Sequence, residues 1–146
     1  MKIETDISVK DQNATCDNAV LSSRLFRGFS IKHNNWIYGD VIHTPEKRMR
    51  IINYTDISSD GVDNFITINE MVESKSVGQC VGLFDAKADD IYEGDIIQDI
   101  RFKYKYIVVY EGNQYVAKSN TGSIGLFETE DCYKIIGNVF QNPELL

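Results

Sequence analysis

The clearest pattern in the chain is an alternation of aromatic or apolar residues with basic residues within positions 95–110. The aromatic and apolar side chains share one parity and are Ile100, Phe102, Tyr104, Tyr106, Val108 and Tyr110. The basic side chains share the other parity and are Arg101, Lys103 and Lys105. A period of two is typical of a strand with one buried face, so we expect these aromatic residues to be more buried than the basic ones. The run is too long for a typical strand, and we therefore expect a bend or turn within it.

Shorter β-prone runs separated by turn-like clusters fill most of the remaining chain. They occupy residues 26–32, 36–43, 48–54, 65–68, 77–84, 114–118 and 133–140. The polar cluster 33–35 predicts a hairpin between the first two runs, and Glu111-Gly112-Asn113 predicts a tight hairpin turn. Residues 56–61 and 85–90 are expected to be polar loops, and 69–75 one helical turn or a loop.

These spacings predict a mainly β fold, since no window of a dozen residues shows helical periodicity. We expect curled antiparallel sheets that form a small barrel-like domain, with an SH3-like C-terminal half as one version of that arrangement. At most one or two short helices are expected.

The aromatic residues define the domain organisation. All 16 fall between Phe26 and Phe140, and residues 1–23 contain none. We therefore expect an N-terminal arm at 1–23 and a β domain at 24–146, with two lobes of about 24–75 and 76–146 as a further subdivision. The arm could add as an edge strand to a neighbouring subunit, which predicts a homo-oligomer, or it could fold over its own sheet.

The charge balance limits the classes of partner that the chain is expected to bind. The chain has 22 acidic and 15 basic residues and a formal net charge of −7, so it does not coat nucleic acid or anionic membranes through bulk electrostatics. No apolar stretch approaches the length of a membrane span, and no signal-peptide pattern opens the chain. We expect a soluble, cytoplasmic protein with no membrane partner.

The metal-ligating and reactive residue types form no recognisable motif. Cys80 and Cys132 lie in apolar contexts and are expected to be reduced core thiols. His33, His43 and Cys80 lack the ligand spacing of a zinc site. The acidic stretch 85–99 does not match a calcium-binding loop and is expected to form a solvated rim. We therefore expect no metal and no cofactor.

One pair of carboxylates could serve catalysis. Glu93 and Asp95 flank Gly94, and a general acid/base pair would need opposed environments in a pocket. The favoured interpretation is a turn, in which the aspartate accepts backbone N–H groups and glycine supplies a positive φ. An enzyme with a site near Tyr92, Glu93 and Asp95 is kept as an alternative.

Two basic clusters make nucleic acid an alternative partner. The first comprises Lys47, Arg48 and Arg50, and the second comprises Arg101, Lys103 and Lys105. Proteins that bind single strands place exposed aromatic rings beside basic residues. The alternation places the rings of 102–106 on the opposite face from the second cluster, so a small nucleic-acid-binding β-barrel is not the favoured interpretation.

Three blocks of the sequence resemble motifs of one protein family. The first is FRGF at 26–29 with WIYGD at 36–40, the second is VGQCVGLFD at 77–85 with IYEGDI at 91–96, and the third is IGNVFQNPEL at 136–145. In order and spacing they resemble the phage-type YopX family over residues 24–146. The chain departs from that pattern in the loop 86–90 and in the extension 1–23.

The resemblance implies a β-rich fold and a phage-related setting, and it implies no reaction or cofactor. The favoured hypothesis is a phage- or prophage-encoded accessory protein that is not an enzyme and binds a host or phage protein. The first two blocks contain the candidate binding residues, which are Arg27, Trp36, Tyr38, Tyr92, Glu93 and Asp95.

Overall fold

The structure is a computed structural model that describes residues 25–56, 65–126 and 129–146. The predicted arm at 1–23 lies outside these ranges, as does the polar loop predicted at 56–61 except for Asp56, which ends a strand. The described strands are β1 (Phe26–Phe29), β2 (Trp36–His43), β3 (Met49–Asp56), β4 (Phe65–Val72), β5 (Gly78–Phe84), β6 (Asp90–Tyr92), β7 (Asp95–Asp99), β8 (Lys105–Glu111), β9 (Gln114–Ser119), β10 (Gly122–Gly125) and β11 (Tyr133–Asn138). The described helical elements are η1 (Ser74–Ser76), α1 (Thr129–Cys132) and η2 (Pro143–Leu145).

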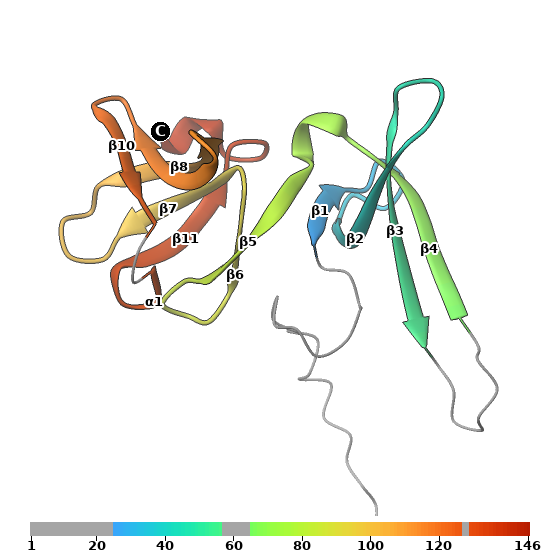
Figure 1. Cartoon of the computed structure of the whole chain (residues 1–146), viewed down its shortest axis with the longest axis horizontal. Helices are drawn as coiled ribbons and strands as arrows, with labels where there is room; N and C mark the ends of the chain where they lie inside the picture. Colours follow the sequence, from blue (N-terminus) through green and yellow to red (C-terminus); the bar gives the residue numbers. More distant parts are fainter. Residues whose placement is uncertain (1–24, 57–64, 127–128) are drawn as a thin grey trace, which may run out of the picture.

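The strands form two antiparallel sheets, which confirms the mainly β prediction. One sheet has the order β4-β3-β2-β1-β5-β6, and the other has the order β10-β9-β8-β7-β11. Figure 1 shows β1–β4 on one side of the molecule and β7–β11 on the other, with β5 and β6 between them. In the part of the chain that is described, neither sheet closes into a barrel, since each order ends in free edge strands.

Both predicted hairpin turns are present. β1 pairs with β2 in the register Phe29↔Trp36. β8 pairs with β9 in the register Glu111↔Gln114, so Gly112 and Asn113 form a two-residue turn. Both turn residues have positive φ, at 60° and 66°. Glycine and asparagine tolerate this conformation, and it matches the twist of the flanking strands.

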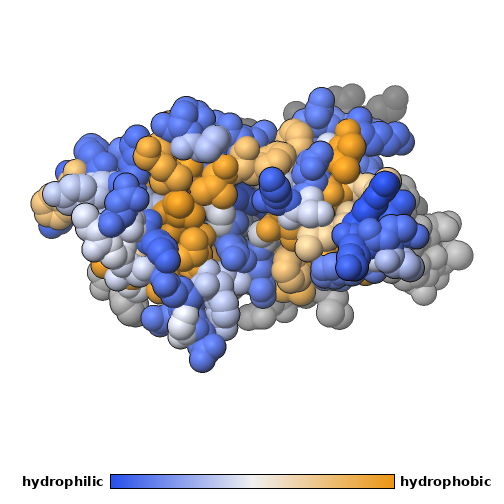
Figure 2. All heavy atoms as spheres, turned by 90° about the horizontal axis from the view of Figure 1, so that it is seen from above, coloured by the Kyte–Doolittle hydropathy of each residue, from blue (hydrophilic) through white to orange (hydrophobic). Residues whose placement is uncertain are grey.

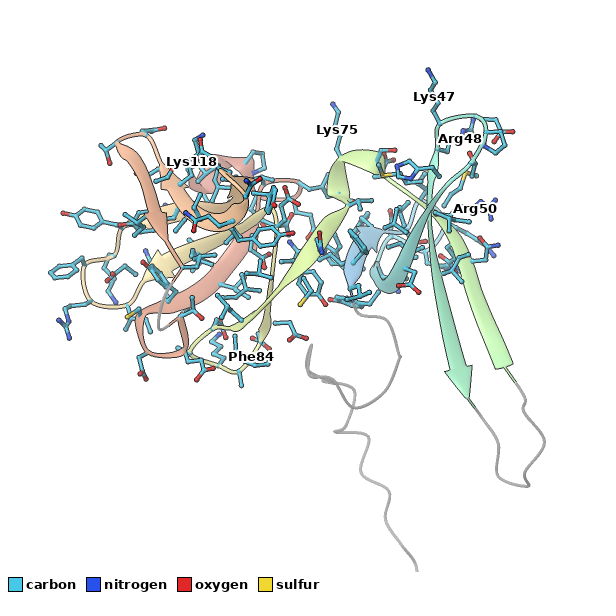
Figure 3. The ribbon with its side chains drawn as sticks, viewed as in Figure 1. Lys47, Arg48, Arg50, Lys75, Phe84 and Lys118 are labelled. Atoms are coloured by element: carbon cyan, nitrogen blue, oxygen red, sulfur yellow. The ribbon has the colours of Figure 1, made fainter. Side chains whose placement is uncertain are left out.

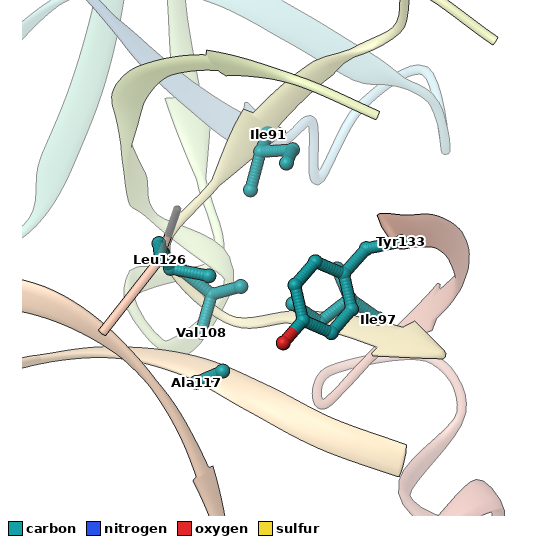
Figure 4. Close-up of a cluster of buried hydrophobic side chains, with 6 residues drawn as sticks. All are labelled: Ile91, Ile97, Val108, Ala117, Leu126 and Tyr133. Atoms are coloured by element: carbon teal, nitrogen blue, oxygen red, sulfur yellow. The ribbon is translucent and has the colours of Figure 1, made fainter. Parts of the chain in front are cut away.

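The buried hydrophobic cluster lies in the half of the molecule that contains the five-stranded sheet. Its members are Ile91, Ile97, Val108, Ala117, Leu126 and Tyr133. They come from β6, β7, β8, β9, β11 and the segment after β10, and Figure 4 shows their side chains converging. This core holds β6 and β7 in place, and these two strands with the turn between them carry Tyr92, Glu93 and Asp95, half of the candidate binding residues.

The alternating stretch 95–110 divides into β7, a turn and β8. The predicted turn within the run is therefore confirmed, but the expected burial of Phe102 and Tyr104 is wrong. Each of these side chains is 64% exposed. The carboxylate of Asp99 accepts hydrogen bonds from the N–H groups of Arg101 (2.8 Å) and Phe102 (2.6 Å), and Lys103 has a positive φ of 65°. This local capping ends the strand. Of the side chains expected to be buried, only Val108 is fully buried and Tyr106 partly so, while Ile100 and Tyr110 are exposed as well.

Other expectations also need correction. Within 69–75, residues 69–72 continue β4, and the expected helical turn is confined to the end of the segment, where η1 (Ser74–Ser76) begins. The acidic stretch 85–99 is not simply a solvated rim, because Asp85 and Asp95 are both buried. Cys132 is a free thiol as expected, but Cys80 is disulfide-bonded, so the expectation of a reduced thiol there is wrong.

Asp85 is buried because backbone groups satisfy its carboxylate. Oδ1 accepts hydrogen bonds from the N–H groups of Lys87 (2.8 Å) and Asp89 (3.0 Å). Oδ2 accepts one from the N–H of Ile135 on β11 (2.9 Å). The side chain thus shapes its own loop and ties that loop to a strand far away in sequence.

Among the described residues, no helix is long and apolar enough to cross a membrane.

Candidate functional site

Five of the six candidate binding residues meet where the two sheets adjoin. Arg27 on β1 and Asp95 at the start of β7 form an ion pair, with 2.6 Å between Nη2 and Oδ1. The Arg27 guanidinium lies over the rings of Trp36 (4.7 Å to the centroid) and Tyr92 (4.9 Å). The Tyr38 ring lies 5.7 Å from that of Tyr92. We call this group of five residues the junction.

The turn between β6 and β7 positions the Asp95 carboxylate. Gly94 has a φ of 85°, and Asp95 Oδ2 accepts a hydrogen bond from the Tyr92 N–H at 2.8 Å. This confirms the turn predicted from the glycine and its flanking carboxylates. Gly78 on β5 lets the turn approach closely, because a Cβ at that position would lie 2.2 Å from the Glu93 carbonyl oxygen.

The ion pair of the junction is nearly inaccessible to water. The side chains of Arg27 and Asp95 are 11% and 1% exposed. Burial raises the pKa of Asp95 to about 6, against the lowering effects of the Arg27 charge and the Tyr92 N–H. Asp95 Oδ1 is paired with Arg27 Nη2 at 2.6 Å, whereas Arg27 Nε has no hydrogen-bond partner among the described residues.

A small cavity of about 220 Å³ adjoins the junction. Its lining includes Arg27, Trp36, Glu93, Asn138 and Phe140. Glu93 is the sixth candidate residue, and it reaches this cavity without joining the ion pair. Asp95 does not line the cavity and is fully buried, so it is poorly placed to exchange a proton with a bound substrate. The geometry suits a clamp between the sheets better than an acid/base pair.

The C-terminal block completes the junction. Gln141 Oε1 accepts hydrogen bonds from Trp36 Nε1 (3.0 Å) and Asn138 Nδ2 (3.2 Å). The Phe140 ring lies 5.5 Å from that of Phe29 and 6.1 Å from that of Trp36. These residues were not among the candidates, although the block IGNVFQNPEL that contains most of them was recognised.

The structure does not bring the two basic clusters together. Lys47, Arg48 and Arg50 lie at and beside the β2–β3 turn, at the β1–β4 end of the molecule (Figure 3). Arg101, Lys103 and Lys105 lie at the β7–β8 turn, at the opposite end (Figure 1). The continuous basic surface that would have joined both clusters is therefore not formed.

The β7–β8 turn combines exposed aromatic and basic side chains. Phe102 and Tyr104 are stacked, with 6.3 Å between ring centroids and 26° between ring planes. The Arg101 guanidinium lies 6.0 Å from the centre of the Phe102 ring. We call residues 101–105 the aromatic tip. Sequence alternation missed this surface because it assigned the rings to the core.

Metal-ligating residue types are not gathered in the described part of the chain. No group of three or more His, Cys, Asp and Glu side chains there is placed to hold a metal ion. His33 instead lies 3.1 Å from Glu70, between Nε2 and Oε1.

The chain belongs to the YopX family, whose model matches residues 25–146 and is described as YopX protein. The matched range contains the junction and the aromatic tip. No curated protein resembles the chain closely enough to count as a match. Among solved structures, the chain is similar to the crystal structure of protein EF1440 from Enterococcus faecalis, with a TM-score of 0.52 and 19% identity. That match covers 88% of this chain and 99% of the other, and it shows the fold alone.

Proposed function

We propose that this protein is a phage- or prophage-encoded accessory protein that works as a non-catalytic binding module in the cytoplasm of a bacterial host. Its partner is a macromolecule of the host or of the phage. Family membership supports the phage-related setting. The enzyme hypothesis, with a site near Tyr92, Glu93 and Asp95, has less support because the Asp95 carboxylate is buried against Arg27.

The observation that carries this proposal is the exposure of two large rings on the aromatic tip. Phe102 and Tyr104 are each 64% exposed, although burial of large apolar side chains stabilises folded proteins. Aromatic residues and arginine are the residue types that contribute most to interfaces between macromolecules. The tip projects from the end of the five-stranded sheet, where a partner can reach it (Figure 1).

The junction supports the same function indirectly. A buried ion pair between β1 and β7 holds the two sheets against each other, so the aromatic tip is presented on a fixed scaffold. Sites on rigid elements lose less conformational entropy when they bind a partner.

The test is capture of partners from extracts of the cells that produce the protein. Tagged wild-type protein is compared with Phe102→Ala/Tyr104→Ala and with the control Ile31→Ala/Tyr110→Ala, whose side chains are 54% and 55% exposed away from the tip. We expect a macromolecule that the wild type and the control retain and the tip variant loses. Equal retention by all three proteins contradicts the proposal.

A further inference from the structure

The aromatic tip continues into a groove of about 500 Å³. Its lining includes Tyr104, Lys105 and Tyr106 from one side and Lys118 and Asn120 from the other. The groove lies where β8 begins and β9 ends, beside Leu146. Its volume lies within the range of pockets that accept small ligands or single nucleotides.

The charge of this groove differs from that of the chain as a whole. The chain carries a net charge of −7, yet the described lining of the groove includes two lysines and no acidic side chain. Of the neighbouring acids, Asp99 caps the tip by accepting N–H groups. Glu111 pairs with the groove's own Lys118 at 3.1 Å, but the two side chains are 49% and 48% exposed, and such surface ion pairs are weak. Lys105 Nζ donates a hydrogen bond to the Leu145 carbonyl oxygen at 2.6 Å, and this neutral acceptor leaves its charge in place. An anionic ligand therefore suits the groove.

The tip adds flat, exposed rings to this positive charge. Successive bases of a single strand stack on aromatic side chains, and arginine and lysine neutralise the phosphates between them. The sequence pattern argued against this combination because it placed the rings opposite the cations. The turn removes that objection by exposing both kinds of side chain.

The exposed rings of Phe102 and Tyr104 suit a ligand that has apolar faces. Figure 2 shows hydrophobic side chains forming a band over the half that carries the five-stranded sheet. A ligand with only negative charge would gain nothing from the rings of Phe102 and Tyr104. A duplex would keep its bases stacked internally, so their faces would not be available to the tip.

We propose that the aromatic tip and the adjoining groove form a binding site for single-stranded nucleic acid. Phe102 and Tyr104 stack against bases. Arg101, Lys103, Lys105 and Lys118 contact the phosphates. This assignment rests on the proposed binding function and names the class of its partner. The low number of cations limits the site to a few nucleotides, in keeping with the acidic character of the chain.

The test is fluorescence anisotropy with labelled single strands of about twelve thymidines or twelve uridines. The two strands separate a DNA site from an RNA site. We expect tighter binding to a single strand than to a duplex of the same length. With four phosphate contacts, a rise in salt from about 50 to about 200 mM should weaken binding by about 50-fold.

Two sets of substitutions distinguish the contribution of ring stacking to binding from the contribution of positive charge. Phe102→Ala/Tyr104→Ala should weaken binding by about tenfold or more at every salt concentration. Lys105→Gln/Lys118→Gln should reduce the slope of log affinity against log salt by about 1.4. Tyr110→Ala serves as the control and should bind as the wild type does, because Tyr110 lies at the far end of β8, about 20 Å along the strand from Tyr104.

The outcomes also separate this assignment from the proposed binding function. Absence of single-strand binding at low salt overturns the nucleic-acid site. Equal affinity of the tip variant and the wild type overturns it as well. If partner capture still depends on Phe102 and Tyr104 and the captured partner is a protein, the binding function stands without the nucleic-acid site. If neither oligonucleotide binding nor partner capture depends on the tip, both proposals fail.

Discussion

Replacing Asp95 with asparagine should change how the stability of the protein depends on pH. The carboxylate has a raised pKa of about 6 in the folded protein, against an ordinary value of 3.8. Below about pH 4 it is protonated in both the folded and the unfolded state. Between about pH 4 and pH 6 the unfolded chain loses this proton while the folded protein keeps it, so the free energy of unfolding falls as pH rises.

The size of the effect follows from the shift in pKa. A difference of about two units between the folded and unfolded states corresponds to about 3 kcal/mol of unfolding free energy. The wild type should therefore lose about 3 kcal/mol relative to Asp95→Asn as the pH rises from about 4 to above 6. The amide cannot titrate in this range, and it retains an oxygen for the Tyr92 N–H.

The assay is urea unfolding at a series of pH values, followed by the fluorescence of Trp36, the single tryptophan of the chain. Trp36 lies against the Arg27 guanidinium and reports on the junction itself. Asp131→Asn, at an exposed position on α1, controls for the loss of one negative charge. A wild type that gains stability relative to Asp95→Asn as the pH rises would refute the reasoning, because the attraction of Arg27 would then outweigh the effect of burial.

Three further predictions concern the scaffold and the arm. Gly78→Ala should destabilise the protein by about 3 kcal/mol in urea unfolding, because its Cβ would meet the Glu93 carbonyl oxygen. Gly82→Ala, at a φ of 78° with open space around it, should lose only about 1–2 kcal/mol, and equal losses would contradict the close approach. Asp85→Ala should lower the unfolding free energy by about 3 kcal/mol or more because three N–H groups lose their acceptor, and Asp85→Asn should lower it less. A thermal shift no larger than that of Asp131→Asn would count against this role. Deletion of residues 1–23 should dissociate a homo-oligomer in light scattering, whereas an unchanged monomer before and after deletion would eliminate arm exchange.

Local chemistry made much of the fold predictable. The Gly112-Asn113 turn and the Gly94–Asp95 turn each depend on a positive φ or on a short carboxylate that accepts nearby N–H groups. These properties are visible in a few consecutive residues. The hairpins and the mainly β class follow from such turns and from the alternation between them.

Burial was harder to predict, because it depends on what covers a face. Phe102 and Tyr104 continue the alternation of β8, but the sheet does not extend to them, since Asp99 caps a turn first. Asp85 lies in a charged stretch, but its second oxygen is satisfied by Ile135, which is distant in sequence. No periodicity within one segment contains this information.

The junction was only partly predictable. Its residues were recognised as candidates from the blocks that contain them, but the pairing of Arg27 with Asp95 requires two sheets to meet. Gln141 and Phe140 were overlooked because their partner Trp36 lies near the other end of the chain.

The most direct test of the proposed binding function is site-specific photocrosslinking at the aromatic tip. A photoreactive phenylalanine analogue replaces Phe102 in one version of the protein and Tyr110 in another, and both are irradiated in the producing cells. The account predicts a crosslinked macromolecule at position 102 and none at position 110, because both positions are exposed but only the first belongs to the tip. The absence of any product at position 102, or the same products at both positions, would contradict the account.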